Sequence, residues 1–122
     1  MSMLREKTTS FAIRAVKLYR YLTEEKKEFI LSKQFVRSAT SIGANVHEAW
    51  NAQSRRDFVH KLNIALKEAN ETQYWLTLLS AGEYLSAHEF QSIYPEALEL
   101  AKILAASVKT VKKDLGKISS EE

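Results

Sequence analysis

The chain has 122 residues, of which 45% are hydrophobic, and it carries a formal net charge of +3. That length fits a single domain, residues 1–122, with its own core, and the absence of cysteine excludes disulfides and thiolate metal sites. Three glycines and one proline disfavour a turn-rich β fold, and the charge permits a polyanionic partner without requiring one. The sequence shows neither a secretory signal peptide nor an apolar run near the roughly 20 residues of a membrane span, so we expect a cytoplasmic protein with no membrane partner.

The first predicted helix covers residues 3–25. Apolar residues recur at spacings of four, three and four from Phe11 to Leu22, so they share one helix face. Four basic residues lie mainly away from that face: Lys7, Arg14, Lys17 and Arg20. This basic face is either an ordinary solvated surface or a surface that contacts phosphate groups.

The second predicted helix, residues 32–50, follows a charged connection at Glu24–Glu28, and Ser32 is its expected N-cap. Its apolar residues alternate at spacings of four and three, as in a heptad seam. Gly43 lies inside this helix, where a glycine costs about 1 kcal/mol relative to alanine. Either it permits the close approach of another helix, or it is a tolerated neutral substitution.

The third predicted helix, residues 54–81, begins at the capping residue Ser54 and ends before Gly82. Its apolar seam is unbroken, and the helix is about 40 Å long. The second half is apolar on more than one side, which fits either contact with two helices of its own bundle or contact with another subunit. We expect an oligomer interface at four apolar residues: Trp50, Tyr74, Trp75 and Leu78.

The fourth predicted helix covers residues 87–115, and Ser86 with Glu89 forms its expected capping box. Pro95 either kinks the first turns or marks a fresh helix start. Lysines gather near the end, where positive charge suits the helix dipole; they are Lys109, Lys112, Lys113 and Lys117. Four long helices with short connections predict an all-α, antiparallel, up-down-up-down four-helix bundle.

A line of polar residues runs beside the apolar seams of the second and third helices. Its members are Arg37, Ser41, Asn45, Glu48, Glu68 and Glu71. Antiparallel pairing brings Arg37 beside Glu68 and within reach of Glu71, which predicts a charge-assisted hydrogen bond. We expect Asn45 to bond across the seam or between subunits, so that the network fixes the register of the helices. The simpler alternative is a half-exposed salt bridge worth under about 1 kcal/mol.

No catalytic or metal-binding constellation is evident in the sequence. A di-iron bundle needs two Glu-x-x-His pairs, whereas the nearest pattern is a single Asp57-x-x-His60. A Gly-x-Ser-x-Gly elbow is missing, and so is a glycine-rich phosphate loop. We therefore expect no metal, no cofactor and no enzymatic activity.

The second and third helices also carry a family resemblance. They contain the stretches Arg37-x-x-x-Ser41-Ile42-x-x-Asn45-Val46-x-Glu48-Ala49 and Lys67-Glu68-Ala69-Asn70-Glu71-Thr72-x-Tyr74-Trp75-Leu76. This pattern resembles the bacterial four helix bundle protein family, also called the 23S rRNA intervening-sequence protein family. The resemblance covers essentially the whole chain, although many members have Gly-Ser where Lys67-Glu68 stands here. It implies an antiparallel four-helix bundle that assembles into a homopentamer with a central channel.

The resemblance also bears on function, because a relative in diversity-generating retroelements is a pentameric accessory protein that binds nucleic acid and the reverse transcriptase. We expect a homo-oligomer, a ring of five on the family's pattern, that binds the backbone of RNA or DNA without reading its sequence. The predicted contacts are basic residues of the first helix and the second turn: Lys7, Arg14, Lys17, Arg20, Arg55 and Arg56. A ring multiplies a modest charge into a substantial local field. The alternative is a protein–protein interaction scaffold with no nucleic-acid partner.

Overall fold

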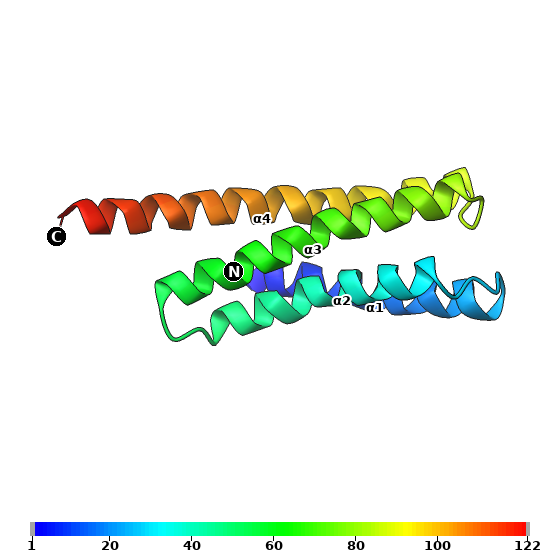
Figure 1. Ribbon diagram of the computed structural model, residues 1–122, viewed down its shortest axis with the longest axis horizontal. Helices are drawn as coiled ribbons and strands as arrows, with labels where there is room; N and C mark the ends of the chain where they lie inside the picture. The colour runs from blue at the N-terminus through cyan, green and yellow to red at the C-terminus, as the bar shows by residue number, and fades with distance from the viewer. Residues whose placement is uncertain (1, 122) are drawn as a thin grey trace.

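Helices form all of the regular secondary structure in the described part of the chain (Figure 1). The computed structural model describes the backbone of residues 2–121 and the side chains of residues 3–116. The four helices are α1 (Ser2–Glu24), α2 (Leu31–Trp50), α3 (Arg55–Ala81) and α4 (Ala87–Glu121). They confirm the prediction of an all-α fold with four helices.

The helices start within one residue of their predicted starts, but α4 ends later than predicted. It continues to Glu121, whereas the prediction ended it at residue 115. Gly116 costs about 1 kcal/mol relative to alanine, and no proline follows it, so this glycine alone does not stop the helix. The helix also runs through Pro95 without interruption, so Pro95 does not mark a fresh helix start.

The start of α2 is capped by Glu28, and the prediction that Ser32 caps it is wrong. The Glu28 carboxylate accepts hydrogen bonds from the backbone amides of Ile30, Leu31 and Ser32 at 3.1, 3.0 and 2.6 Å. Ser32 already lies inside the first turn, and its hydroxyl donates to the Glu28 carbonyl at 2.6 Å. Burial alone raises the pKa of Glu28, but the bonds from the three amides outweigh it and lower that pKa. A buried carboxylate thus satisfies amides that the helix itself leaves free.

Helices that follow one another in the chain pack side by side, and of the helix pairs in contact α1 and α4 make the smallest contact. Arg37 of α2 pairs with Glu71 of α3, and Glu48 pairs with Lys61, so residue numbers rise along α2 as they fall along α3. Figure 1 shows the chain reversing direction at each connection and the end of α4 projecting beyond the other helices. The last turns of α4 are therefore covered on fewer sides than the rest of the helix.

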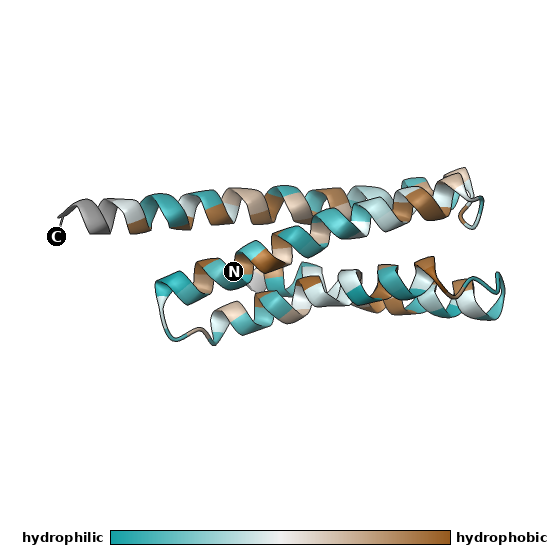
Figure 2. Cartoon of the chain, in the orientation of Figure 1, coloured by the Kyte–Doolittle hydropathy of each residue, from teal (hydrophilic) through white to brown (hydrophobic). Residues whose placement is uncertain are grey.

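The apolar seams of the four helices meet in the core. Figure 2 shows hydrophobic and hydrophilic residues alternating along every helix. Large side chains that are fully buried come from all four: Phe11, Leu22, Phe35, Ile42, Leu62, Leu76, Leu79 and Leu104. Gly43 is buried as well, and a Cβ built on it would lie 3.4 Å from the carbonyl oxygen of Thr8. The backbone of α1 therefore passes beside α2 at Gly43, at a distance where an added Cβ would make ordinary van der Waals contact, so the packing does not require a glycine.

Candidate functional site

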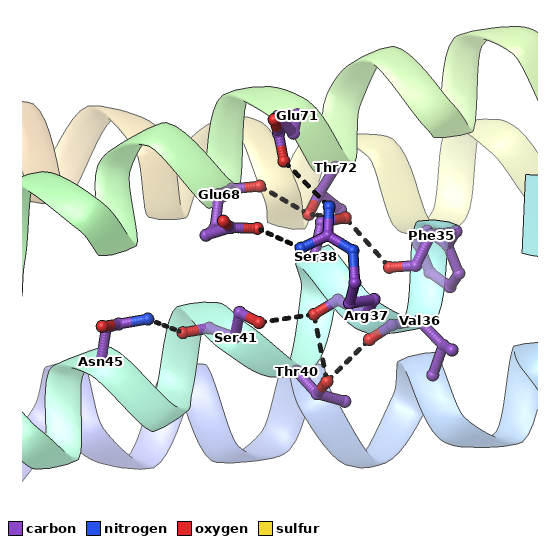
Figure 3. A network of polar contacts seen from close by, with 10 residues as sticks. All are labelled: Phe35, Val36, Arg37, Ser38, Thr40, Ser41, Asn45, Glu68, Glu71 and Thr72. Atoms are coloured by element: carbon purple, nitrogen blue, oxygen red, sulfur yellow. Dashed lines mark hydrogen bonds and ion pairs between the residues drawn. The ribbon is translucent and has the colours of Figure 1, made fainter. Parts of the chain in front are cut away.

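Arg37 and two glutamates form the centre of the polar line predicted between α2 and α3. The Arg37 guanidinium lies 3.4 Å from the Glu71 carboxylate and 3.8 Å from the Glu68 carboxylate, measured from nitrogen to oxygen. The side chain of Glu68 is 14% exposed, whereas those of Glu71 and Arg37 are 39% and 54% exposed. Figure 3 shows the guanidinium reaching from α2 toward both carboxylates. These separations describe an ion pair across the two helices that is too long for a strong bidentate bond.

Glu68 is the incompletely paired member of this group. Its Oε2 atom is buried and has no hydrogen-bond partner among the described residues. Burial raises the pKa of Glu68, the neighbouring Glu71 carboxylate raises it further, and the Arg37 charge offsets these effects only in part. A buried carboxylate oxygen without a donor is costly, so Glu68 favours either a proton or a donor from another molecule.

The remaining members of the polar line bond elsewhere. The Ser41 hydroxyl donates to the Arg37 carbonyl at 2.7 Å, and the Asn45 amide donates to the Ser41 carbonyl at 2.9 Å. Both bonds stay within α2, as is usual for short polar side chains inside a helix. The cross-seam bond expected of Asn45 is therefore absent within the described chain. Glu48 pairs instead with Lys61 of α3 at 3.0 Å.

A buried pair of hydroxyl groups also joins α2 to α3, and the sequence analysis missed it. The Thr72 hydroxyl donates to the Ser38 hydroxyl at 2.9 Å, and the Ser38 hydroxyl donates to the Phe35 carbonyl at 3.1 Å (Figure 3). Thr72 and Ser38 are both fully buried. Thr72 occupies a position of the apolar seam, and a polar residue at such a position is the clue that a facing polar partner exists.

Two of the four basic residues predicted on α1 are paired with glutamates of α4. The Lys7 ammonium lies 2.5 Å from Glu99. Arg14 forms an ion pair with Glu96 and donates to the Ser92 carbonyl at 2.9 Å. The partners are 92 and 82 positions away in the chain, so the sequence alone does not reveal them. The basic face of α1 consequently carries less free charge than its composition suggests.

Lys17 and Arg20 are the other two predicted residues of α1, and both are exposed. Neither forms an ion pair with any residue whose side chain is described. The neighbouring Ile13 and Val16 are 54% and 45% exposed, so this part of α1 mixes positive charge with apolar surface.

Arg55 and Arg56 open α3 at the end of the molecule where α4 finishes. Both are exposed, and Arg56 lines a groove of about 360 Å³ together with Lys112 and Leu115. We call this surface the basic end, and its exposed residues are Arg55, Arg56, Lys109, Lys112 and Lys113. None of them forms an ion pair within residues 3–116. The sequence pattern predicted these lysines only as complements of the helix dipole. The side chain of Lys117 lies outside the described residues.

The residues predicted to form the oligomer interface pack largely within the chain. Trp50 meets Phe58 edge to face with 5.2 Å between ring centroids, and Trp75 meets Tyr74 in the same manner at 5.1 Å. Both tryptophans pack against the core, and Leu78 is half-buried. Tyr74 is 57% exposed, and the buried Nε1 of Trp75 has no hydrogen-bond partner among the described residues.

The most exposed large apolar side chains lie in the connection between α1 and α2. Phe29 and Ile30 are 60% and 77% exposed. They follow the buried Glu28 directly, and the Ile30 amide donates to the Glu28 carboxylate, so the cap fixes the backbone that presents them. The sequence pattern predicted no role for these two residues.

The described residues contain no group of three histidine, aspartate or glutamate side chains placed to hold a metal ion. The Nδ1 atom of His47 lies 2.8 Å from the Gly43 carbonyl of its own helix. In the same part of the chain, no helix combines the length and the hydrophobicity that crossing a membrane requires.

The chain matches a protein-family model and solved structures of known proteins. The model of the 23S rRNA-intervening sequence protein family matches residues 3–106. The crystal structure of a protein of unknown function from the S23 ribosomal protein family of Bacteroides thetaiotaomicron superposes with a TM-score of 0.87 at 52% identity, covering 88% of this chain and 96% of that chain. No curated protein matches. These matches confirm the resemblance noted in the sequence, and the chain belongs to the 23S rRNA-intervening sequence protein family.

Proposed function

We propose that this protein is a non-enzymatic homo-oligomer that binds the phosphate backbone of nucleic acid through its basic end. The observation that carries the proposal is the absence of ion-pair partners, within residues 3–116, for the exposed arginines and lysines gathered there. Asp57 and Asp114 lie in the same region but leave a clear positive excess. Free lysine and arginine side chains release counterions when they meet phosphates, and this release dominates binding that does not depend on sequence.

The basic residues of α1 take a smaller part in this proposal. Lys7 and Arg14 already face Glu99 and Glu96, so a phosphate would have to compete with a carboxylate for each of them. Lys17 and Arg20 are exposed and form a second, weaker contact surface.

Self-association is the second element of the proposal, and it rests on two buried atoms of α3. Glu68 Oε2 and Trp75 Nε1 have no hydrogen-bond partner in the described chain. They are seven residues apart, so they lie on the same side of the helix, and the exposed Tyr74 is adjacent. A neighbouring copy that supplies a hydrogen-bond donor to Glu68 and an acceptor to Trp75 would remove the free-energy penalty of burying these two unbonded atoms. We propose a ring of five copies, the number that the family resemblance implies, which repeats the basic end around the assembly.

Charge reversal at the basic end tests the nucleic-acid part of the proposal. We expect Arg55→Glu with Arg56→Glu to lower the affinity for a fluorescent nucleic acid at least about tenfold at 100 mM salt, because reversed charges repel phosphates. Lys26→Glu with Lys33→Glu is the matched control, since it changes the net charge equally at exposed positions outside the basic end. Equal affinities for the two variants would contradict the proposal.

A protein-binding scaffold is the second candidate function, and the exposure of Phe29 and Ile30 favours it. A surface of this kind binds through apolar contact, so the binding would change little with salt. Wild-type protein that binds no nucleic acid even at about 20 mM salt would favour this candidate over the first.

A further inference from the structure

We infer that the nucleic acid is bound as a double helix, against a lysine-bearing face of α4. This inference rests on the proposed function and adds the class of polyanion. The face lies between Lys102 and Lys113, where the sequence contains no acidic residue. We call it the lysine face, and its exposed residues are Lys102, Ala105, Ala106, Lys109, Thr110, Lys112 and Lys113.

The spacing of the lysines makes this face a straight and rigid array of charge. Lys102, Lys109 and Lys113 are seven and four residues apart, so they follow one line along the helix and span about 16 Å. Double-helical nucleic acid carries about one negative charge per 1.7 Å of its axis, so a contact of that length faces several phosphates at once. Because both partners are stiff, little ordering is needed to bring the charges together.

The side chains between the lysines allow a close approach to the duplex. Ala105 and Ala106 lie between Lys102 and Lys109 and extend no further than a methyl group. Lysine contacts to phosphate carry no sequence information, and the lysine face holds no arginine, asparagine or glutamine that could read base edges. Binding is therefore independent of sequence.

A single strand is the less suitable ligand because the lysine face has no aromatic ring on which bases could stack. Proteins that bind single strands combine a basic groove with exposed aromatic side chains. The large aromatic residues with substantial exposure in the described chain are Phe29 and Tyr74, and neither lies on this part of α4. Without stacking, affinity follows charge density, which is higher for a duplex, and the salt dependence per contact is also steeper for a duplex than for a single strand.

The experiment compares a 20-base-pair DNA duplex, a 20-base-pair RNA duplex and a 20-nucleotide single strand by fluorescence anisotropy with the full-length protein. We expect at least one duplex to bind about tenfold more tightly than the single strand at 100 mM salt. Comparing the two duplexes shows whether the protein prefers DNA or RNA, since both carry the same phosphate groups. Equal affinity for the single strand and both duplexes would overturn this inference and leave the proposed function standing. A protein that binds none of the three at low salt would overturn both.

Two pairs of substitutions test whether the duplex binds at the lysine face. Lys109→Ala with Lys113→Ala removes two contacts, so we expect the slope of log affinity against log salt to fall by about 1.8 in magnitude. Ala105→Glu with Ala106→Glu keeps every lysine but adds negative charge between them, and we expect it to lower duplex affinity more than tenfold. Lys26→Ala with Lys33→Ala is the matched control for lost charge. Circular dichroism verifies that each variant is folded, and unchanged duplex binding by both folded lysine-face variants would overturn the inference.

Discussion

Glu28 and Glu68 are two glutamates removed from water to a similar extent, and their surroundings act on them in opposite ways. Glu28 is 7% exposed, and the side chain of Glu68 is 14% exposed. Glu28 receives three backbone amides at the start of α2, which lower its pKa despite burial. Glu68 has a buried oxygen without any described donor, and burial together with Glu71 raises its pKa. Burial alone therefore does not decide whether a carboxylate stabilises the fold; the number of donors within reach decides it.

The largest effect is expected at Glu28. Glu28→Gln should lower the free energy of unfolding by about 2 kcal/mol at pH 7, because an ionised cap accepting three amides is replaced by a neutral one. The folded pKa of Glu28 lies below the unfolded value of about 4.3, so this stabilisation is present above that pH and is lost as pH falls through the folded pKa. Urea denaturation at pH 7 and at pH 3.5 measures both differences.

The exposed neighbour Glu25 provides the control for Glu28. Glu25→Gln removes the same charge without removing a cap and should change stability by less than about 0.5 kcal/mol. If Glu25→Gln and Glu28→Gln lowered the free energy of unfolding equally, the three amide hydrogen bonds to Glu28 would not stabilise the fold.

The Ser38–Thr72 pair is a buried polar contact between uncharged groups, unlike the two glutamates. Thr72→Val should cost about 1 kcal/mol, because the hydroxyl that links α3 to Ser38 disappears from a buried site. Combining it with Ser38→Ala removes both partners, so the double variant should lose less than the sum of the two single variants. Additive losses in a double-mutant cycle would mean that the two hydroxyls are not coupled.

Glu68 should respond in the direction opposite to Glu28. Glu68→Gln should raise the free energy of unfolding by about 1 kcal/mol at pH 7.5, because a buried charge without a donor is removed. The folded pKa of Glu68 lies above its unfolded value, so the contribution of Glu68 to stability is most favourable below about pH 4.3 and declines as pH rises through the folded pKa. The advantage of the variant should therefore vanish near pH 4.

The same Glu68 variant also bears on assembly. Light scattering and denaturation on one sample separate two situations: a monomer in which Glu68 Oε2 lacks a hydrogen-bond donor, and an oligomer in which another copy supplies that donor. In the oligomer, Glu68→Gln should weaken association instead of stabilising the chain. A loss of stability at pH 7.5 without any change in association would contradict the account of Glu68 given above.

The smallest effect on stability is expected where carboxylates remain in water. Glu96→Gln with Glu99→Gln removes the partners of Arg14 and Lys7, and these exposed pairs should contribute under about 1 kcal/mol each. The freed cations should, however, raise nucleic-acid affinity a few-fold at 50 mM salt. Unchanged affinity would show that α1 does not face the bound polyanion.

The sequence was sufficient to predict the helices but not to predict which polar side chains bond to one another. The four-helix fold and the buried seams follow from local spacing, because residues three and four apart share one face. The capping role of Glu28 was missed because it depends on the path of the connection, and Glu28 looked like one more member of a charged turn.

The partners of Lys7 and Arg14 were missed for a related reason. A charge run shows how many cations a helix carries, but their neutralisation depends on residues from a different helix, here Glu99 and Glu96. The late end of α4 was missed because the predicted helix ended at residue 115, just before Gly116, although one glycine costs a helix little.

The sparse contact between α1 and α4 has a consequence for how the molecule opens. These helices make the smallest contact of any pair that touches and are linked by exposed ion pairs that salt screens. In contrast, α2 and α3 share a buried hydroxyl bond and the most extensive contact. Amide hydrogen exchange should therefore proceed through partial opening, with α1 deprotected before the α2–α3 pair and faster still at high ionic strength. In kinetic terms, α2 and α3 form the slow-exchanging unit of the protein.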